Sequence, residues 1–145
     1  MQILEKRFYQ RSLTRKGNYS LNQTAKGCGV KNFDKFHNAG YMGLYNGETA
    51  DDVAKRKKLR YREDILDNMG SEELAANLFR ITQTEAKLKR DNVSNENEAN
   101  QTHHNIGKNI REVIAKNGGT MPEKLPTPKK SLKELSKEKK VNLEI

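Results

Sequence analysis

Helical periodicity is the feature of this 145-residue sequence that most limits its possible folds. Two long segments, 72–90 and 96–116, repeat apolar residues every three or four positions, which is typical of helices with one buried face. Strand-like alternation is nearly absent. The pattern predicts an all-α fold built on a long antiparallel helical hairpin, with a polar turn at 91–95. The residues predicted to be buried along its two stripes are Leu78, Ile81, Ile106, Ile110 and Val113.

Capping signals at the expected helix ends support this prediction. Thr49 and Ser131 are each followed three residues later by an acid, as in a capping box, and Asn95 is followed by Glu98. Ser71 precedes two acids, which favour the positive end of a helix dipole. Glycines at 70 and at 118–119 stand where left-handed C-caps are needed.

An aromatic, glycine-rich stretch at 40–47 follows a short helix expected at 32–39. We expect a tight loop in which glycines supply the turns and Tyr41, Leu44 and Tyr45 pack onto the hairpin. The alternative is an exposed recognition loop that offers its tyrosines to a partner. Further short helices are expected at 50–58 and ending near Met69.

Three prolines between residues 122 and 128 exclude a helix interior and predict an extended strap across the helices, held by Met121 and Leu125. The expected organisation is a basic N-terminal helical segment at 1–30, a helical domain at 31–128 and a Lys-rich basic C-terminal tail at 129–145, which we expect to be a frayed helix.

The formal net charge of +9 is concentrated at the two ends of the chain. Residues 1–40 carry +6 and residues 121–145 carry +3, whereas the middle is balanced. Such ends suit an acidic partner, either DNA or an acidic protein face, but a merely solvated surface is equally compatible. No apolar run is long enough to span a bilayer, and no signal peptide is evident, so we expect no membrane contact and a cytoplasmic location.

No catalytic, metal or cofactor site is predicted. His103 and His104 are adjacent, so on a regular helix their side chains diverge by about 100° and do not share an ion easily. His103 falls in the apolar stripe and is predicted to be a packed histidine, with Asn100 near enough to hydrogen-bond it. Cys28 lies in no motif, and a single cysteine excludes an internal disulfide. No phosphate-binding glycine loop is present.

Clustered cations are the remaining candidates for a functional site. We predict that eight of them form a basic surface for DNA or a DNA-coated protein. The alternative is that they are solvated charges that complement helix ends. The eight residues are Lys55, Arg56, Lys57, Lys58, Arg80, Lys87, Lys89 and Arg90.

Four segments between residues 35 and 130 resemble the bacterial DNA-damage-inducible protein D (DinD) family. They are 38–47 (NAGYMGLYNG), 69–90 (MGSEELAANLFRITQTEAKLKR), 98–103 (EANQTH, continuing to Gly107 and Arg111) and 118–128 (GGTMPEKLPTP). These strings are long and distinctive. Residues 1–30 are similar only around 5–7 and 25–30.

The resemblance implies a non-enzymatic bacterial protein of the SOS response that modulates RecA recombinase filaments on single-stranded DNA, and thereby recombination. Its implied partners are a RecA-type recombinase and single-stranded DNA. Family members also carry an N-terminal BRO-type domain linked to DNA binding, and the resemblance implies that this sequence corresponds to the region after that domain. Three alternatives stay open: an antirepressor-like protein-interaction domain of a mobile element, a DNA-binding accessory protein, and a repair nuclease, which the lack of a carboxylate constellation opposes.

Overall fold

The computed structural model describes residues 3–61 and 63–144, and this part of the chain contains helices and no strands. The all-α prediction is therefore confirmed. The α-helices are α1 (Ile3–Gly27), α2 (Phe33–Leu44), α3 (Ala50–Arg56), α4 (Ser71–Arg90), α5 (Glu96–Lys116) and α6 (Leu132–Glu144). Two single-turn 3₁₀ helices, Leu66–Asn68 and Pro122–Lys124, lie in the connections.

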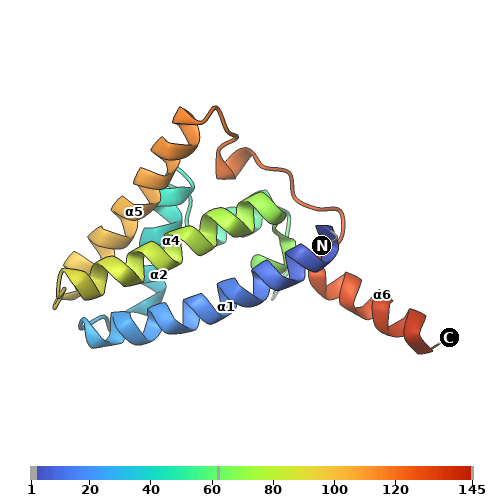
Figure 1. Ribbon diagram of the computed structural model, residues 1–145, viewed down its shortest axis with the longest axis horizontal. Coiled ribbons are helices and arrows are strands. Elements are labelled where there is room, and N and C mark those ends of the chain that lie inside the picture. The colour runs from blue at the N-terminus through green and yellow to red at the C-terminus, as the bar shows by residue number, and fades with distance from the viewer. Residues whose placement is uncertain (1–2, 62, 145) are drawn as a thin grey trace.

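Helices α1 and α4 lie side by side over most of their length and run in the same direction (Figure 1). Hydrogen bonds between the two helices occur in the same order along both of them. Ser71 donates to Gln10 near the start, and Thr24 donates to Glu85 near the end. Between them, Gly17 lets α4 approach closely, because a Cβ there would lie 3.2 Å from Ile81 Cγ2.

A second parallel pair is formed by α2 and α5. Glu96, at the start of α5, accepts hydrogen bonds from the backbone N–H groups of Lys31 and Asn32, just before α2. Arg111, near the end of α5, donates to the carbonyl oxygen of Leu44, which ends α2. The last turns of α2 would otherwise leave this carbonyl without a partner.

The predicted hairpin is only part of this arrangement. α4 and α5 are consecutive and joined by the short turn at 91–95, but they diverge from it as the arms of a V (Figure 1). Each helix packs most extensively on another one, α4 on α1 and α5 on α2.

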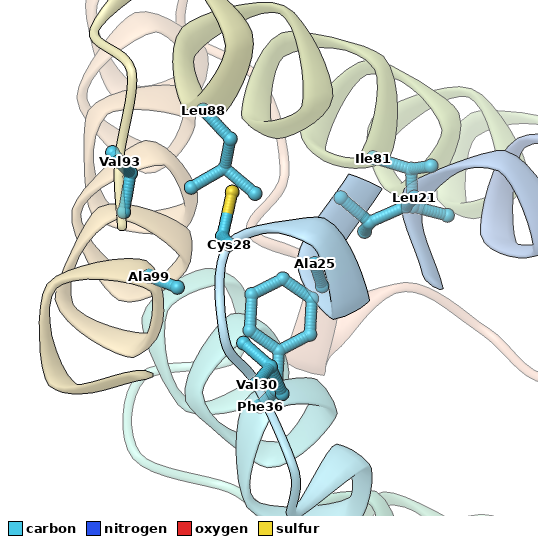
Figure 2. Packing of buried hydrophobic residues seen from close by; sticks show 9 residues of the cluster. All are labelled: Leu21, Ala25, Cys28, Val30, Phe36, Ile81, Leu88, Val93 and Ala99. Carbon is cyan, nitrogen blue, oxygen red and sulfur yellow. The ribbon is translucent and has the colours of Figure 1, made fainter. Parts of the chain in front are cut away.

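Among the described residues, two apolar clusters form the core. The first joins α1, α2, α4 and α5 near the closed end of the V. In Figure 2 the Cys28 thiol points toward Leu88, and Phe36 lies beneath Ala25. The second cluster lies between the C-terminal end of α2 and the first half of α4. Its members are Tyr41, Leu44, Tyr45, Val53, Leu66, Met69, Leu74 and Ile110.

The divergence of α4 and α5 decides which stripe residues are buried. Ile81 and Ile110 are buried, as predicted. Leu78 and Ile106 are only partly buried. The prediction for Val113 is wrong, because its side chain is 52% exposed. At the level of Val113, α5 has diverged from α4. The apolar stripe of α5 therefore extends past the region in which the two helices are in contact.

Two of the three glycines of residues 40–47, Gly40 and Gly43, serve a different purpose from the predicted one. Tyr41, Leu44 and Tyr45 are buried, as predicted, but residues 40–44 are the last turns of α2 rather than a loop. The turn is made afterwards by Asn46 and Gly47, whose φ angles are 54° and 97°. Gly43 instead permits contact with α5, since a Cβ there would overlap the His104 carbonyl oxygen.

Replacing Gly43 with alanine is therefore expected to destabilise the protein by about 1–3 kcal/mol. The clash is with backbone, so no side-chain rotation can relieve it. Gly27→Ala is the matched control, because a Cβ at this last residue of α1 would meet nothing within 4 Å. Chemical denaturation should show the control to be neutral or slightly stabilised. Equal stability of the two variants would contradict the close approach of α2 and α5.

The segment after α5 is an extended strap interrupted by one helical turn. Met121 and Leu125 are partly buried, and the 3₁₀ turn Pro122–Lys124 lies between them. Glu123 of that turn accepts hydrogen bonds from Arg111 at 2.5 and 3.0 Å, which fastens the strap to α5. Beyond it, Ser131 accepts a hydrogen bond from the backbone N–H of Glu134, and α6 projects away from the other helices (Figure 1).

Predicted side-chain caps mark where α3 and α5 begin, but not where α4 begins. Thr49 and Asp52 form the complete capping box at α3, and Asn95 accepts from the backbone N–H of Glu98 at α5. At α4 the predicted cap, Ser71, is the first helical residue, and Gly70 occupies the cap position. The Ser71 hydroxyl donates to Gln10 instead, so it joins α4 to α1.

Candidate functional site

The eight predicted basic residues do not form one surface. Residues 55–58 lie around the end of α3, where Lys57 contacts Glu73 in the first turn of α4. Residues 87–90 lie in the last turn of the same helix. At a rise of 1.5 Å per residue, these two levels of α4 are about 20–25 Å apart. The fold therefore separates the predicted residues into two clusters at opposite ends of α4.

Two of the eight residues are not on the surface at all. The side chain of Lys57 is 0% exposed and its Nζ lies 2.7 Å from Glu73 Oε1. Arg80 is 1% exposed and lies on the side of α4 that faces the interior. Neither residue can contact a partner in this fold, so their assignment to a basic surface is corrected. Neither residue carries a sequence signal of burial, because Glu73 and His103, which they contact, are distant along the chain.

The cluster around α3 retains two open cations. Lys55 and Lys58 are exposed. Arg56 is partly buried, donates to both carboxylate oxygens of Glu48, and its guanidinium carbon lies 5.9 Å from the centre of the Tyr45 ring. Arg56 thus holds the α2–α3 connection in place, and the exposed charge of this cluster comes from its two lysines.

The cluster at the end of α4 is more accessible. The side chains of Lys87, Lys89 and Arg90 are 40%, 66% and 68% exposed. They make ion pairs with Asp91 and Glu85, and the hydrogen bond from Lys87 lowers the pKa of Asp91. Exposed pairs of this kind are weak, so the cations remain able to bind an anion. Because α1 and α4 are parallel, Lys26 in the last turn of α1 lies at the same end. We call Lys26, Lys87, Lys89 and Arg90 the basic end.

Arginines of α1 account for much of the N-terminal positive charge. Arg7 is buried and donates to the backbone carbonyl oxygens of Asp67 and Met69. Arg11 and Arg15 bind Asp67, and Arg15 also binds Asp64 at 2.6 Å. These side chains hold the connection before α4 against α1, so they are structural.

A buried polar chain runs through the centre of the molecule, and the sequence pattern does not reveal it. Glu73 accepts from Lys57 and, at 2.5 Å, from the Tyr45 hydroxyl. Asn77 donates to the Tyr45 hydroxyl and accepts from Arg80 at 3.0 Å. Glu73, Asn77 and Arg80 lie three or four residues apart and therefore share one face of α4.

The chain of polar groups ends at His103, which is fully buried as predicted. Arg80 Nη1 lies 2.5 Å from His103 Nε2, and His103 Nδ1 lies 2.8 Å from the Phe36 carbonyl oxygen. Because arginine can only donate, Nε2 must accept and Nδ1 must carry the proton. The ring is therefore neutral. Asn100 is not its partner, since neither amide atom of Asn100 has a hydrogen bond among the described residues.

The guanidinium of Arg80 has no carboxylate among its hydrogen-bond partners in the described part of the chain. It donates to Asn77 and His103, and it lies over the Tyr41 ring, 5.2 Å from the ring centre. Burial lowers the pKa of Arg80. Because Tyr45, Asn77 and His103 are 0% exposed, no substrate can reach this chain of groups. We interpret it as a polar core that fixes the register of α2, α4 and α5.

Acidification should destabilise the protein through His103. Burial, followed by the charge of Arg80, holds the pKa of His103 well below its ordinary value of 6.5, and burial also lowers that of His37. The unfolded chain then binds more protons below pH 6.5, so stability falls as the pH drops. The slope for His103 approaches about 1.4 kcal/mol per pH unit. Equilibrium denaturation between about pH 7 and 5 measures it, above the range where carboxylates titrate.

Two variants test the assignment of this pH dependence. His103→Gln should reduce the slope, although it also lowers stability at neutral pH. His104→Gln, at the neighbouring and partly exposed histidine, should keep the slope because His103 is unchanged. A wild-type protein that is equally stable at both ends of this pH range would contradict the neutral, Arg80-bound ring.

A metal site and a membrane-spanning helix both find no support in the described residues. Residues 3–61 and 63–144 contain no group of three His, Cys, Asp or Glu side chains placed to hold a metal ion. None of the described helices combines the length and apolar character that crossing a bilayer requires. Cys28 is buried in the first core cluster, where burial raises the pKa of its thiol.

Comparison with known proteins defines the class to which this helical chain belongs. The family model described as the DinD C-terminal domain matches residues 2–135, so the chain belongs to that family. It is 47% identical over 140 residues to DNA damage-inducible protein D of Escherichia coli strain K12. The match covers 94% of this chain and its aligned region is the C-terminal part of the relative, so the chain spans about half (51%) of the relative's length. No solved structure matches.

Proposed function

We propose that this chain acts in the bacterial response to DNA damage by modulating RecA-type recombinase filaments on single-stranded DNA, and that it does so without being an enzyme. The observation that carries the proposal is its membership of the DinD family, with 47% identity to a protein named for induction by DNA damage. The recombinase and the DNA strand are the partners that the family resemblance implies.

The surface charge is compatible with such a partner. Single-stranded DNA in a filament carries phosphates, and exposed lysines and arginines bind phosphates as well as acidic protein surfaces. The basic end offers four cations at one end of the parallel helices α1 and α4, and Lys55 and Lys58 offer two at the other. The polar chain of the interior is closed to solvent, which supports a binding role over a catalytic one.

The test is a strand-exchange assay with a RecA-type recombinase, performed with the wild-type chain and with two neutralised variants. We expect the wild-type chain to inhibit exchange. Lys87→Gln/Lys89→Gln/Arg90→Gln should weaken inhibition and reduce the salt slope by about 0.7 for each phosphate of a single strand that is no longer bound. Lys55→Gln/Lys58→Gln tests the other cluster by itself.

The outcomes separate the alternatives. No effect of the wild-type chain on exchange, filament stability or recombinase ATPase would overturn the proposal. Inhibition that survives both neutralised variants would remove these cations from the mechanism and leave the proposal to another surface. Divalent-metal-dependent cleavage of the DNA in a control without recombinase would show a nuclease instead.

A further inference from the structure

The side of α1 that faces away from α4 presents a row of exposed residues with an unusual composition. Its members follow one another in alternating steps of four and three residues, which keeps them on one side of a helix with 3.6 residues per turn. We call this row the α1 ridge. It consists of Glu5, Tyr9, Ser12, Lys16, Tyr19, Gln23 and Lys26, all exposed. The buried residues Arg7, Thr14, Leu21 and Ala25 lie on the opposite side of the helix.

Two large aromatic side chains on this ridge are open to solvent. Tyr9 is 58% exposed and Tyr19 is 70% exposed. Neither has a hydrogen bond or ring contact within the described part of the chain. The solvent side of a surface helix is ordinarily polar, so the two rings are not explained by the packing of α1. The step of ten residues from one to the other corresponds to about 15 Å along the helix.

Lysines alternate with the tyrosines along the ridge. Lys16 lies between the two rings, and Lys26 follows Tyr19 by two helical turns. Neither lysine makes an ion pair with a described residue, in contrast to Arg11 and Arg15, which bind Asp67 and Asp64. After Glu5, whose charge suits the first turn of the helix, α1 contains no further acid. The ridge therefore combines open rings with uncompensated positive charge.

We propose that the α1 ridge binds single-stranded DNA, with bases stacking on Tyr9 and Tyr19 and with Lys16 and Lys26 contacting phosphates. Stacking platforms interleaved with cations are the means by which proteins hold single strands without regard to sequence. The separation of about 15 Å between the rings spans about four nucleotides at a stacked spacing of about 3.4 Å. Lys26 also belongs to the basic end, so the positive track continues past Tyr19 toward α4.

Other partners fit the ridge less well. A DNA duplex would offer phosphates to the lysines. Its bases are already stacked on one another, however, so they are not available to stack on the tyrosines. A protein helix would require an aliphatic stripe, and the ridge has none. This proposal deepens the proposed function, because it names the surface through which the chain would bind a single strand directly. It rests on the proposed function for the choice of DNA as that strand.

Fluorescence anisotropy with a labelled oligothymidine strand and the chain alone, without recombinase, tests the ridge. Tyr9→Ala/Tyr19→Ala should weaken binding by about fivefold or more for each ring removed, because each stacked base contributes substantially to affinity. Tyr9→Phe/Tyr19→Phe should restore binding, since the ring stacks and the hydroxyl is not needed. Lys16→Gln should reduce the salt slope by about 0.7.

Phe79→Ala is the matched control. Phe79 is also a half-exposed aromatic residue (50%), but it lies on α4, and its removal should leave strand binding unchanged. All of these side chains are on the surface, so circular dichroism should show the helices intact. Undetectable strand binding at low salt overturns the proposal, as does equal binding by the Tyr9→Ala/Tyr19→Ala variant. Tighter binding to duplex DNA than to the single strand would also overturn the proposal. So would self-association of the chain that is detected by sedimentation and lost in the Tyr9→Ala/Tyr19→Ala variant.

The proposal and the proposed function can fail separately. A chain that binds the strand through the ridge but does not affect strand exchange would refute recombinase modulation and leave the ridge intact. A chain that inhibits exchange equally well in wild-type form and as Tyr9→Ala/Tyr19→Ala, with no strand binding of its own, would refute the ridge alone.

Discussion

Replacing Glu73 with alanine should lower the free energy of unfolding by about 3–5 kcal/mol, because it leaves the Lys57 ammonium buried without its counter-ion. Glu73 is 1% exposed and binds Lys57 at 2.7 Å. The remaining partners of the ammonium are the Asn68 carbonyl oxygen at 3.2 Å and the Thr127 hydroxyl at 3.4 Å, neither of which carries charge. The Tyr45 hydroxyl would also lose its acceptor. Urea denaturation followed by circular dichroism measures the change.

A double-mutant cycle of Lys57→Met, Glu73→Gln and their combination separates the ion pair from the reduction in side-chain volume in Glu73→Ala. Lys57→Met/Glu73→Gln removes both charges and keeps the approximate size of each side chain, so it should recover most of the stability. Glu63→Ala breaks the exposed pair with Arg60, whose side chain is 89% exposed, and should cost no more than about 1 kcal/mol. If Glu73→Ala cost no more than Glu63→Ala, Lys57 would not be buried in solution.

Local signals in the sequence are sufficient to place most helices. The caps at Thr49 and Asn95 involve residues three positions apart, so they act within one turn and can be recognised without knowledge of the fold. The helix predicted at 96–116 has the bounds of α5, and the one predicted at 72–90 begins one residue after the start of α4. Their periodicity also identifies Ile81 and Ile110 as buried.

Features that depend on a distant partner cannot be recognised in this way. Gly43 looks like a turn residue, and only the backbone of His104 across the interface shows that it is a helical contact. Lys57 and Arg80 look like surface charge, because Glu73 and His103 come beside them only in the folded chain. For the candidate site, the sequence therefore identifies the exposed cations correctly but assigns the buried Lys57 and Arg80 to the surface.

Aromatic exposure is equally hidden from the sequence. Tyr41 and Tyr45 are buried, whereas Tyr9 and Tyr19 are exposed, although all four lie in or next to helices. The difference arises from which side of α1 and α2 faces another helix. A basic helix with one polar and one buried side gives a weak apolar stripe, so its outward tyrosines carry no distinguishing pattern in the sequence.

The second large effect is expected at Ile110, where replacement by alanine should cost about 2–5 kcal/mol by leaving a cavity in the second core cluster. Ile110 is 6% exposed and packs in the cluster that contains Leu44, Tyr45 and Leu74. Because these neighbours are held by α2 and α4, a simple side-chain rotation does not refill the space that the removed atoms leave. Chemical denaturation at neutral pH measures the change.

Val113→Ala provides the control from the same apolar stripe, one turn further along α5. Its side chain is 52% exposed, so truncation leaves no cavity and should change stability by less than about 0.5 kcal/mol. The comparison tests the divergence of α4 and α5 directly. In a closed hairpin, Val113 would be buried against α4 and both truncations would be costly, whereas in the open V only that of Ile110 is. A large destabilisation at Val113 would therefore show that the two helices stay together beyond Ile110 in solution.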